Sequence, residues 1–127
     1  MRAEAEKLLR SRLRYLEENR LHLVIDADAH ATDPTSLEGE SRRRYEHSPD
    51  YYHGRPVSGE ELLAEMRLAR IDMALIWQNP AATPCNSDPA SNYRALLEAN
   101  RYIYDLARKY PNRFIPAGWT DPRALRL

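Results

Sequence analysis

The chain has 127 residues, which is the size of one small domain with a single core. Its 19 basic and 19 acidic residues balance, so no overall charge favours binding to nucleic acid or to an acidic membrane surface. Lone Cys85 excludes an intramolecular disulfide, and no apolar run approaches the roughly 20 residues that span a bilayer.

Residues 1–20 are predicted to form a helical extension ahead of the main domain. Leu9, Leu13 and Leu16 recur at helical spacing, with charged residues between them. The segment lacks the apolar stretch of a signal peptide, so we expect a soluble, cytoplasmic protein. The leucine stripe is expected to pack on its own domain; packing against a second subunit, in a homo-oligomer, is the alternative.

Residues 21–127 are predicted to form one α/β domain. Strands are predicted over 21–29, 71–78 and 113–120, the last weakened by Pro116, which cannot donate a ladder hydrogen bond. Because helices are predicted between these strands, the pattern favours βαβ units and a parallel sheet.

Local signals define the two intervening helices. One begins at Ser58, where S-G-E-E is a capping-box pattern. The other begins with Asp88 as N-cap, and it ends before Pro111, since the residue preceding a proline disfavours helical geometry. The connection over 31–57 is polar and broken by Pro and Gly, so we expect a long loop there.

The first predicted strand carries the main chemical signal, in the stretch HLVIDADAHATDP. Strand alternation would place Asp26, Asp28 and His30 on one face and apolar residues on the other. A carboxylate and an imidazole two residues apart can bind one divalent metal from the same side, with zinc preferred and manganese as the alternative. The competing interpretation is a chance D-x-H triplet in which His30 is an ordinary loop residue.

Three blocks of this sequence resemble a known family. VIDADAH is similar to the first-strand I-D-x-H-x-H signature of the amidohydrolase superfamily. EELLAEMRLARIDMALIWQ and ALLEANRYIYDLARKYPNRFIPAGWTDP look like the following helix–strand units of its amidohydrolase-related branch, which includes aminocarboxymuconate-semialdehyde decarboxylase and γ-resorcylate decarboxylase. The resemblance covers about residues 22–122. It implies the first three β/α units of a TIM (β/α)₈ barrel.

The resemblance also implies roles for individual residues. His30 matches the second histidine of the signature and would be a metal ligand. Asp28 stands where the first histidine usually lies; some decarboxylating members place a carboxylate there, so Asp28 would also ligate. Asp26 matches the motif's aspartate one step deeper and would be structural support.

The implied activity is that of a metal-dependent enzyme. The reaction would be hydrolysis of a C–N or C–O bond in an amide or ester, or non-oxidative decarboxylation of an aromatic or enoic carboxylic acid by a lyase. A full barrel has eight strands in about 250 residues, so this chain is expected to be an N-terminal fragment, inactive alone, whose catalytic residues lie beyond Leu127. The alternative is a non-catalytic truncated product that acts only as an interaction or structural piece.

Other residues are weaker candidates. His47 and His53 lie near Tyr45, Tyr51 and Tyr52 and would belong either to a substrate-facing lid or to an exposed polar loop. Arg42, Arg43 and Arg44 would contact an anionic substrate or simply be solvated. Trp77 and Trp119 would line an aromatic-acid pocket or be buried against a helix. Cys85 has no histidine at a spacing typical of a thiolate nucleophile.

Overall fold

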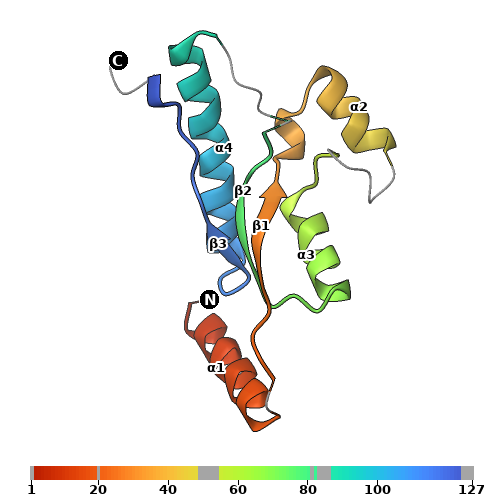
Figure 1. Cartoon of the computed structure of the whole chain (residues 1–127), viewed down its shortest axis with the longest axis vertical. Coiled ribbons are helices and arrows are strands. Elements are labelled where there is room, and N and C mark those ends of the chain that lie inside the picture. The colour runs from red at the N-terminus through yellow and green to blue at the C-terminus, as the bar shows by residue number, and fades with distance from the viewer. Residues whose placement is uncertain (1, 20, 49–54, 81, 83–86, 124–127) are drawn as a thin grey trace.

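The computed structural model describes residues 2–19, 21–48, 55–80, 82 and 87–123. It is a mixed α/β structure built on a three-stranded, all-parallel sheet in the order β1-β2-β3. The predicted alternation of strands and helices is confirmed (Figure 1). The elements in chain order are α1 (Arg2–Glu18), β1 (Ile25–Ala31), the 3₁₀ helix η1 (Pro34–Ser36), α2 (Gly39–His47), α3 (Gly59–Leu68), β2 (Met73–Gln78), α4 (Pro89–Lys109) and β3 (Phe114–Pro116).

The predicted caps set the starts of the two crossover helices. At the start of α3, Ser58 Oγ accepts a hydrogen bond from Glu61 N at 3.2 Å, and Glu61 returns one by accepting from Ser58 N at 2.8 Å. At the start of α4, Asp88 accepts from the backbone of Ser91 at 2.9 Å, ahead of a proline in the first turn. Helix α4 ends at Lys109, as the following Tyr-Pro pair predicts.

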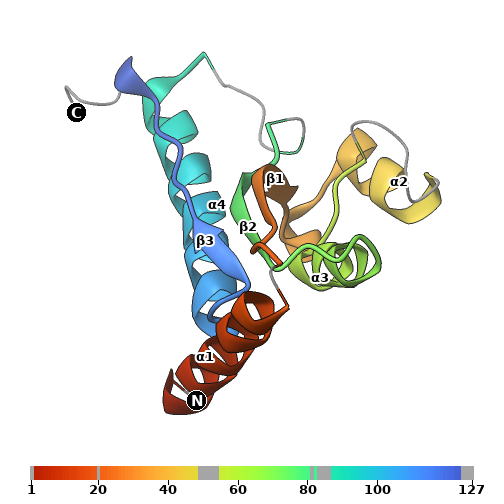
Figure 2. The ribbon, with the colours of Figure 1, turned by 60° about the horizontal axis from the view of Figure 1, so that its bottom comes forward.

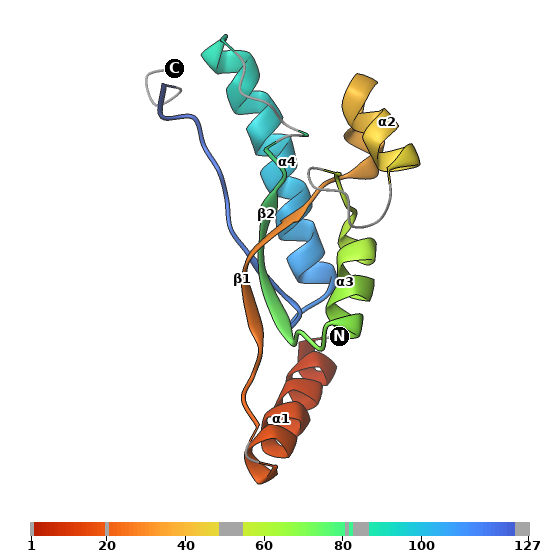
Figure 3. The same cartoon turned by 45° about the vertical axis from the view of Figure 1, so that its right-hand side comes forward.

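Both crossover helices cover the same face of the sheet (Figure 3). A Cβ on Gly59 would collide with the Leu106 side chain, so glycine is what permits the close approach of α3 to α4. In the described part of the chain no helix covers the opposite face, which we call the open face, and its Trp77 is only half-buried. The buried apolar core consists of Ala29, Ala31, Leu63, Met66, Ala74, Ile76, Ile103, Leu106 and Phe114.

The predicted alternation along the first strand is wrong between Asp26 and Ala29. Asp26 pairs with Ala74, and Ala29 pairs with Ile76. Between these two pairs, β1 has two residues where β2 has one. This irregularity is a β-bulge. After the extra residue, each side chain points to the face opposite to the one that regular alternation from Asp26 would give. Asp26 therefore lies with buried Ala74 toward the helices, whereas His30 pairs with Trp77 on the open face.

Two further boundaries differ from the prediction. The 31–57 connection, predicted to be a long loop, contains η1 and α2. Ion pairs between Glu40 and Arg44 at 3.3 Å and between Arg42 and Glu46 at 3.6 Å stabilise α2. This helix has no apolar stripe that would have predicted it. The third strand is limited to Phe114–Pro116 instead of 113–120, ending at the proline that cannot donate. The first strand spans Ile25–Ala31, later than the predicted 21–29.

Helix α1 packs on its own domain at the end where the strands begin (Figure 2). Leu16 is buried and Leu9 half-buried, and Arg12 forms an ion pair with Asp72 at 2.8 Å, just before β2. Leu13, the third residue of the predicted stripe, remains 44% exposed. The burial of Leu16 and the Arg12–Asp72 ion pair favour packing of α1 on its own domain, and contact with a second subunit stays a prediction.

Candidate metal site

The two predicted metal ligands lie at the carboxyl end of β1. His30 is half-buried and Asp28 is exposed. Because β1 and β2 are parallel, their carboxyl ends meet at one edge of the sheet, which is where open α/β sheets and barrels place their sites. The bulge leaves Asp28 beside the open face and removes Asp26 from it. Asp26 instead accepts a hydrogen bond from the Asp28 backbone N at 3.1 Å, a supporting contact like the one that the resemblance implies.

Trp77 of β2 contacts both candidate ligands. Its indole Nε1 donates to Asp28 Oδ1 at 2.9 Å. Its ring stacks on His30, with ring centroids 5.2 Å apart and planes inclined by 23°. Trp119 lies against the same indole at 5.7 Å and 50°. The structure thus assembles Asp28, His30, Trp77 and Trp119 into one cluster, which we call the β1–β2 polar cluster.

The segment after β3 holds Trp119 against α4. Asn100 Nδ2 donates to the Trp119 carbonyl at 2.7 Å, and Asn100 Oδ1 accepts from Trp119 N at 3.0 Å. Further on, buried Asn92 donates to the carboxylate of buried Asp121 at 2.7 Å. The Arg123 side chain beside Asp121, helped by the Arg123 backbone and by Asn92, holds the pKa of this carboxyl far below its ordinary 3.8. These contacts fix the residues that carry Trp119.

The donors in the cluster are an imidazole nitrogen and a carboxylate oxygen, a set that zinc and manganese both accept. Within the described residues, no group of three or more His, Cys, Asp or Glu side chains could hold a metal. A structural zinc site needs four protein ligands and a catalytic one three. By ligand chemistry, Asp28 and His30 could supply at most two ligands, so a complete site would need ligands from outside the described residues.

The other predicted candidates do not join this cluster. His47 is exposed at the end of α2, and Tyr45 packs under the Arg55 guanidinium at 5.3 Å. The arginines of α2 pair with Glu40 and Glu46 of the same helix, which favours the solvated interpretation of Arg42, Arg43 and Arg44. Tyr51, Tyr52, His53 and Cys85 lie outside the described residues.

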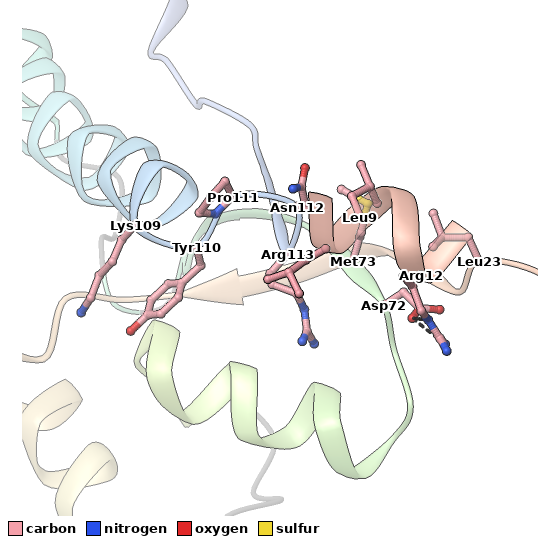
Figure 4. Close-up of a pocket in the computed structure, with 11 residues that line it drawn as sticks. Leu9, Arg12, Leu23, Asp72, Met73, Lys109, Tyr110, Pro111, Asn112 and Arg113 are labelled. Atoms are coloured by element: carbon pink, nitrogen blue, oxygen red, sulfur yellow. Dashed lines mark hydrogen bonds and ion pairs between the residues drawn. The ribbon is translucent and has the colours of Figure 1, made fainter. Parts of the chain in front are cut away.

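Two pockets lie away from the β1–β2 polar cluster. One, of about 560 Å³, is at the opposite end of the sheet between α1 and the turn from α4 to β3, with the Arg12–Asp72 pair on its wall (Figure 4). The other, of about 430 Å³, lies between α4 and the ends of β1 and β2, beside Thr32 and Gln78. Neither is lined by Asp28 or His30, so neither supports the metal site.

The contact that sequence reasoning missed is the Trp77–Asp28 hydrogen bond. The sequence predicts each residue near the end of its own strand. Aligning the carboxyl ends of the two predicted parallel strands would have placed them side by side.

Among the described helices, none is long and apolar enough to cross a membrane. Comparison of the sequence with models of known protein families, and with functionally characterised proteins, found no match. The amidohydrolase resemblance therefore stays a prediction that rests on the quoted residues.

Proposed function

We propose that this chain forms the first three strand–helix units of a metal-dependent (β/α)₈-barrel enzyme, with Asp28 and His30 as two of its metal ligands. The carrying observation is their position at the carboxyl end of a parallel strand, next to a sheet face that none of the described helices covers. Both crossover helices lie on the other face, as they would around an arc of a barrel. Further strands would complete the barrel and supply the remaining ligands.

The proposed reaction class is hydrolysis of an amide or ester, or non-oxidative decarboxylation of an aromatic or enoic acid. A divalent metal at such a site polarises a substrate oxygen, lowers the pKa of a bound water, or orients a carboxylate. Asp28 and His30 would hold the ion, and Trp77 and Trp119 would give the mouth an aromatic wall. A carboxylate in place of the signature's first histidine slightly favours decarboxylation, because some decarboxylating members of the resembling branch place a carboxylate there.

Titration calorimetry with Zn²⁺ and Mn²⁺ tests the ligand pair on the 127-residue chain. We expect weak binding with one ion per chain, abolished by Asp28→Ala and by His30→Ala. Asp105→Ala on α4 and His22→Ala before β1 are matched controls, since both side chains are exposed and lie outside the cluster. Equal binding by all five proteins would reject the site.

A second candidate function is that of a non-catalytic piece covered by a partner. The observation that favours it is apolar exposure at and before the start of β1: Val24 and Ile25 are each 49% exposed, and Leu21 is 50% exposed. Light scattering after size exclusion separates the two functions. A non-catalytic interaction piece would associate and bind no zinc at Asp28 and His30, whereas zinc lost with His30→Ala supports the enzyme.

A further inference from the structure

The indole of Trp77 contacts the two candidate ligands in two different ways. Its N–H edge meets the Asp28 carboxylate at 2.9 Å, and its face covers the His30 ring at 5.2 Å. We infer that Trp77 is a positioning residue that presents Asp28 and His30 to a metal ion and sets how tightly they bind it. This inference rests on the proposed function, which supplies the metal.

The hydrogen bond determines how Asp28 can ligate. An indole has one donor and no acceptor, so its N–H must bind an oxygen of the carboxylate, and the bond is strengthened by the negative charge. The bond takes one lone pair of Oδ1 and fixes the plane of the carboxylate, while the remaining lone pairs of both oxygens stay available to a metal. The Asp28 side chain is exposed and, without Trp77, its terminal torsion would be broad. Fixing that torsion in advance removes part of the entropy cost of binding an ion.

Stacking constrains the second ligand. The His30 and Trp77 rings are inclined by only 23°, so rotation of the imidazole would break their contact. Trp119 supports the indole from another side at 5.7 Å, and Asn100 fixes Trp119 through two hydrogen bonds. The orientation of His30 is therefore held by a series of contacts that begins on α4.

The position of Trp77 argues against a purely structural role. The residues on either side of it, Ile76 and Gln78, face the helices and are buried. Trp77 is half-buried on the open face, which carries no helix among the residues that the structure describes. The apolar core does not include it. A tryptophan there contributes less to the core than to the orientation of its neighbours.

One substitution separates the hydrogen bond from the aromatic packing. Trp77→Phe keeps a ring to stack on His30 and removes the Nε1 donor. Tyr104→Phe is the control, because Tyr104 is exposed on α4 and lies outside the β1–β2 polar cluster. Loss of a contact that orients a ligand weakens metal affinity by about 10–100-fold. We expect a loss of that size for Trp77→Phe, measured by Zn²⁺ titration calorimetry, and affinity close to that of the unaltered chain for Tyr104→Phe.

A metal-free readout tests the hydrogen bond itself. The sequence has two tryptophans, so in Trp119→Phe the single indole N–H resonance in a ¹H–¹⁵N spectrum belongs to Trp77. Adding Asp28→Ala to that variant should move this resonance upfield and speed its exchange with solvent. Adding Asp105→Ala should leave it in place.

Each failure has a distinct meaning. An indole resonance that ignores Asp28→Ala overturns the positioning role, even if zinc binding needs both ligands. Equal zinc affinities for Trp77→Phe and Tyr104→Phe also overturn it. If the unaltered chain binds no zinc, the proposed function and the metal-holding role fail together, although the indole signal can still report the Trp77–Asp28 contact.

Discussion

Asn100 binds the backbone of Trp119 with both ends of its side-chain amide, at 2.7 Å through Nδ2 and at 3.0 Å through Oδ1. One residue of α4 thus satisfies a donor and an acceptor of a segment that has left the sheet. Because Trp119 lies against Trp77, this pairing ties the orientation of the β1–β2 polar cluster to α4.

Asn100→Ala is expected to release Trp119. Two part-buried hydrogen bonds at about 0.5–1.5 kcal/mol each predict a loss of roughly 1–3 kcal/mol in the free energy of unfolding. The near-UV circular dichroism from the paired tryptophans should also weaken. Asn19→Ala is the control, because its side chain caps only the exposed end of α1. An unchanged tryptophan signal would show that Asn100 does not hold Trp119.

Gly59→Ala is expected to destabilise the contact between α3 and α4. The added methyl would overlap the Leu106 side chain, which is itself buried in the core. Overpacking of this kind costs about 1–3 kcal/mol, measured by urea unfolding. Gly118→Ala provides the comparison, since a Cβ there meets nothing closer than 3.7 Å. Equal stabilities of the two variants would mean that Leu106 moves away at no cost.

The two buried amides Gln78 and Asn92 should respond in opposite ways to replacement by leucine. Gln78 is 2% exposed, and its amide has no hydrogen-bond partner within the described residues. Removing it should leave the free energy of unfolding unchanged or raised. Asn92 donates to Asp121, so Asn92→Leu leaves a buried carboxylate short of a donor and should cost about 1–3 kcal/mol. A comparable loss for Gln78→Leu would show that something outside the described residues binds that amide.

Asp121 should make the protein sensitive to acid. Its pKa in the folded state lies well below the ordinary 3.8, chiefly because Arg123 donates to it. Because its pKa is lowered in the folded state, ionised Asp121 raises the free energy of unfolding above pH 3.8. This contribution is lost as the pH falls from 3.8 toward the folded-state pKa. Asp121→Asn should therefore unfold more easily at neutral pH and lose less stability between about pH 4 and 2. Parallel stability curves for the two proteins would contradict this.

Local rules predicted the helix starts. The capping box at Ser58 and the Asp88-Pro89 start are formed by residues within three positions of each other, so tertiary contacts were not needed to find them. Helix α2 was not predicted. The contacts that stabilise it are also local, but they are ion pairs along its surface, and the helix has no apolar stripe.

The candidate site was predicted in part. His30 and Asp28 were identified from a motif, which needs only their order in the chain. The bulge that separates Asp26 from them depends on pairing with β2, and the Trp77–Asp28 bond joins residues 49 positions apart. Neither feature has a signal in its own segment, since alternation assumes a regular ladder that only the partner strand defines.

The most direct measurement is the location of zinc in crystals of the 127-residue chain grown with the metal, from anomalous scattering at the zinc edge. A site at Asp28 and His30 predicts a peak about 2.0–2.1 Å from a His30 ring nitrogen and about 2.0–2.2 Å from an Asp28 carboxylate oxygen. Zinc bound only by exposed histidines such as His22 and His47, with no density between Asp28 and His30, would contradict the proposed metal site.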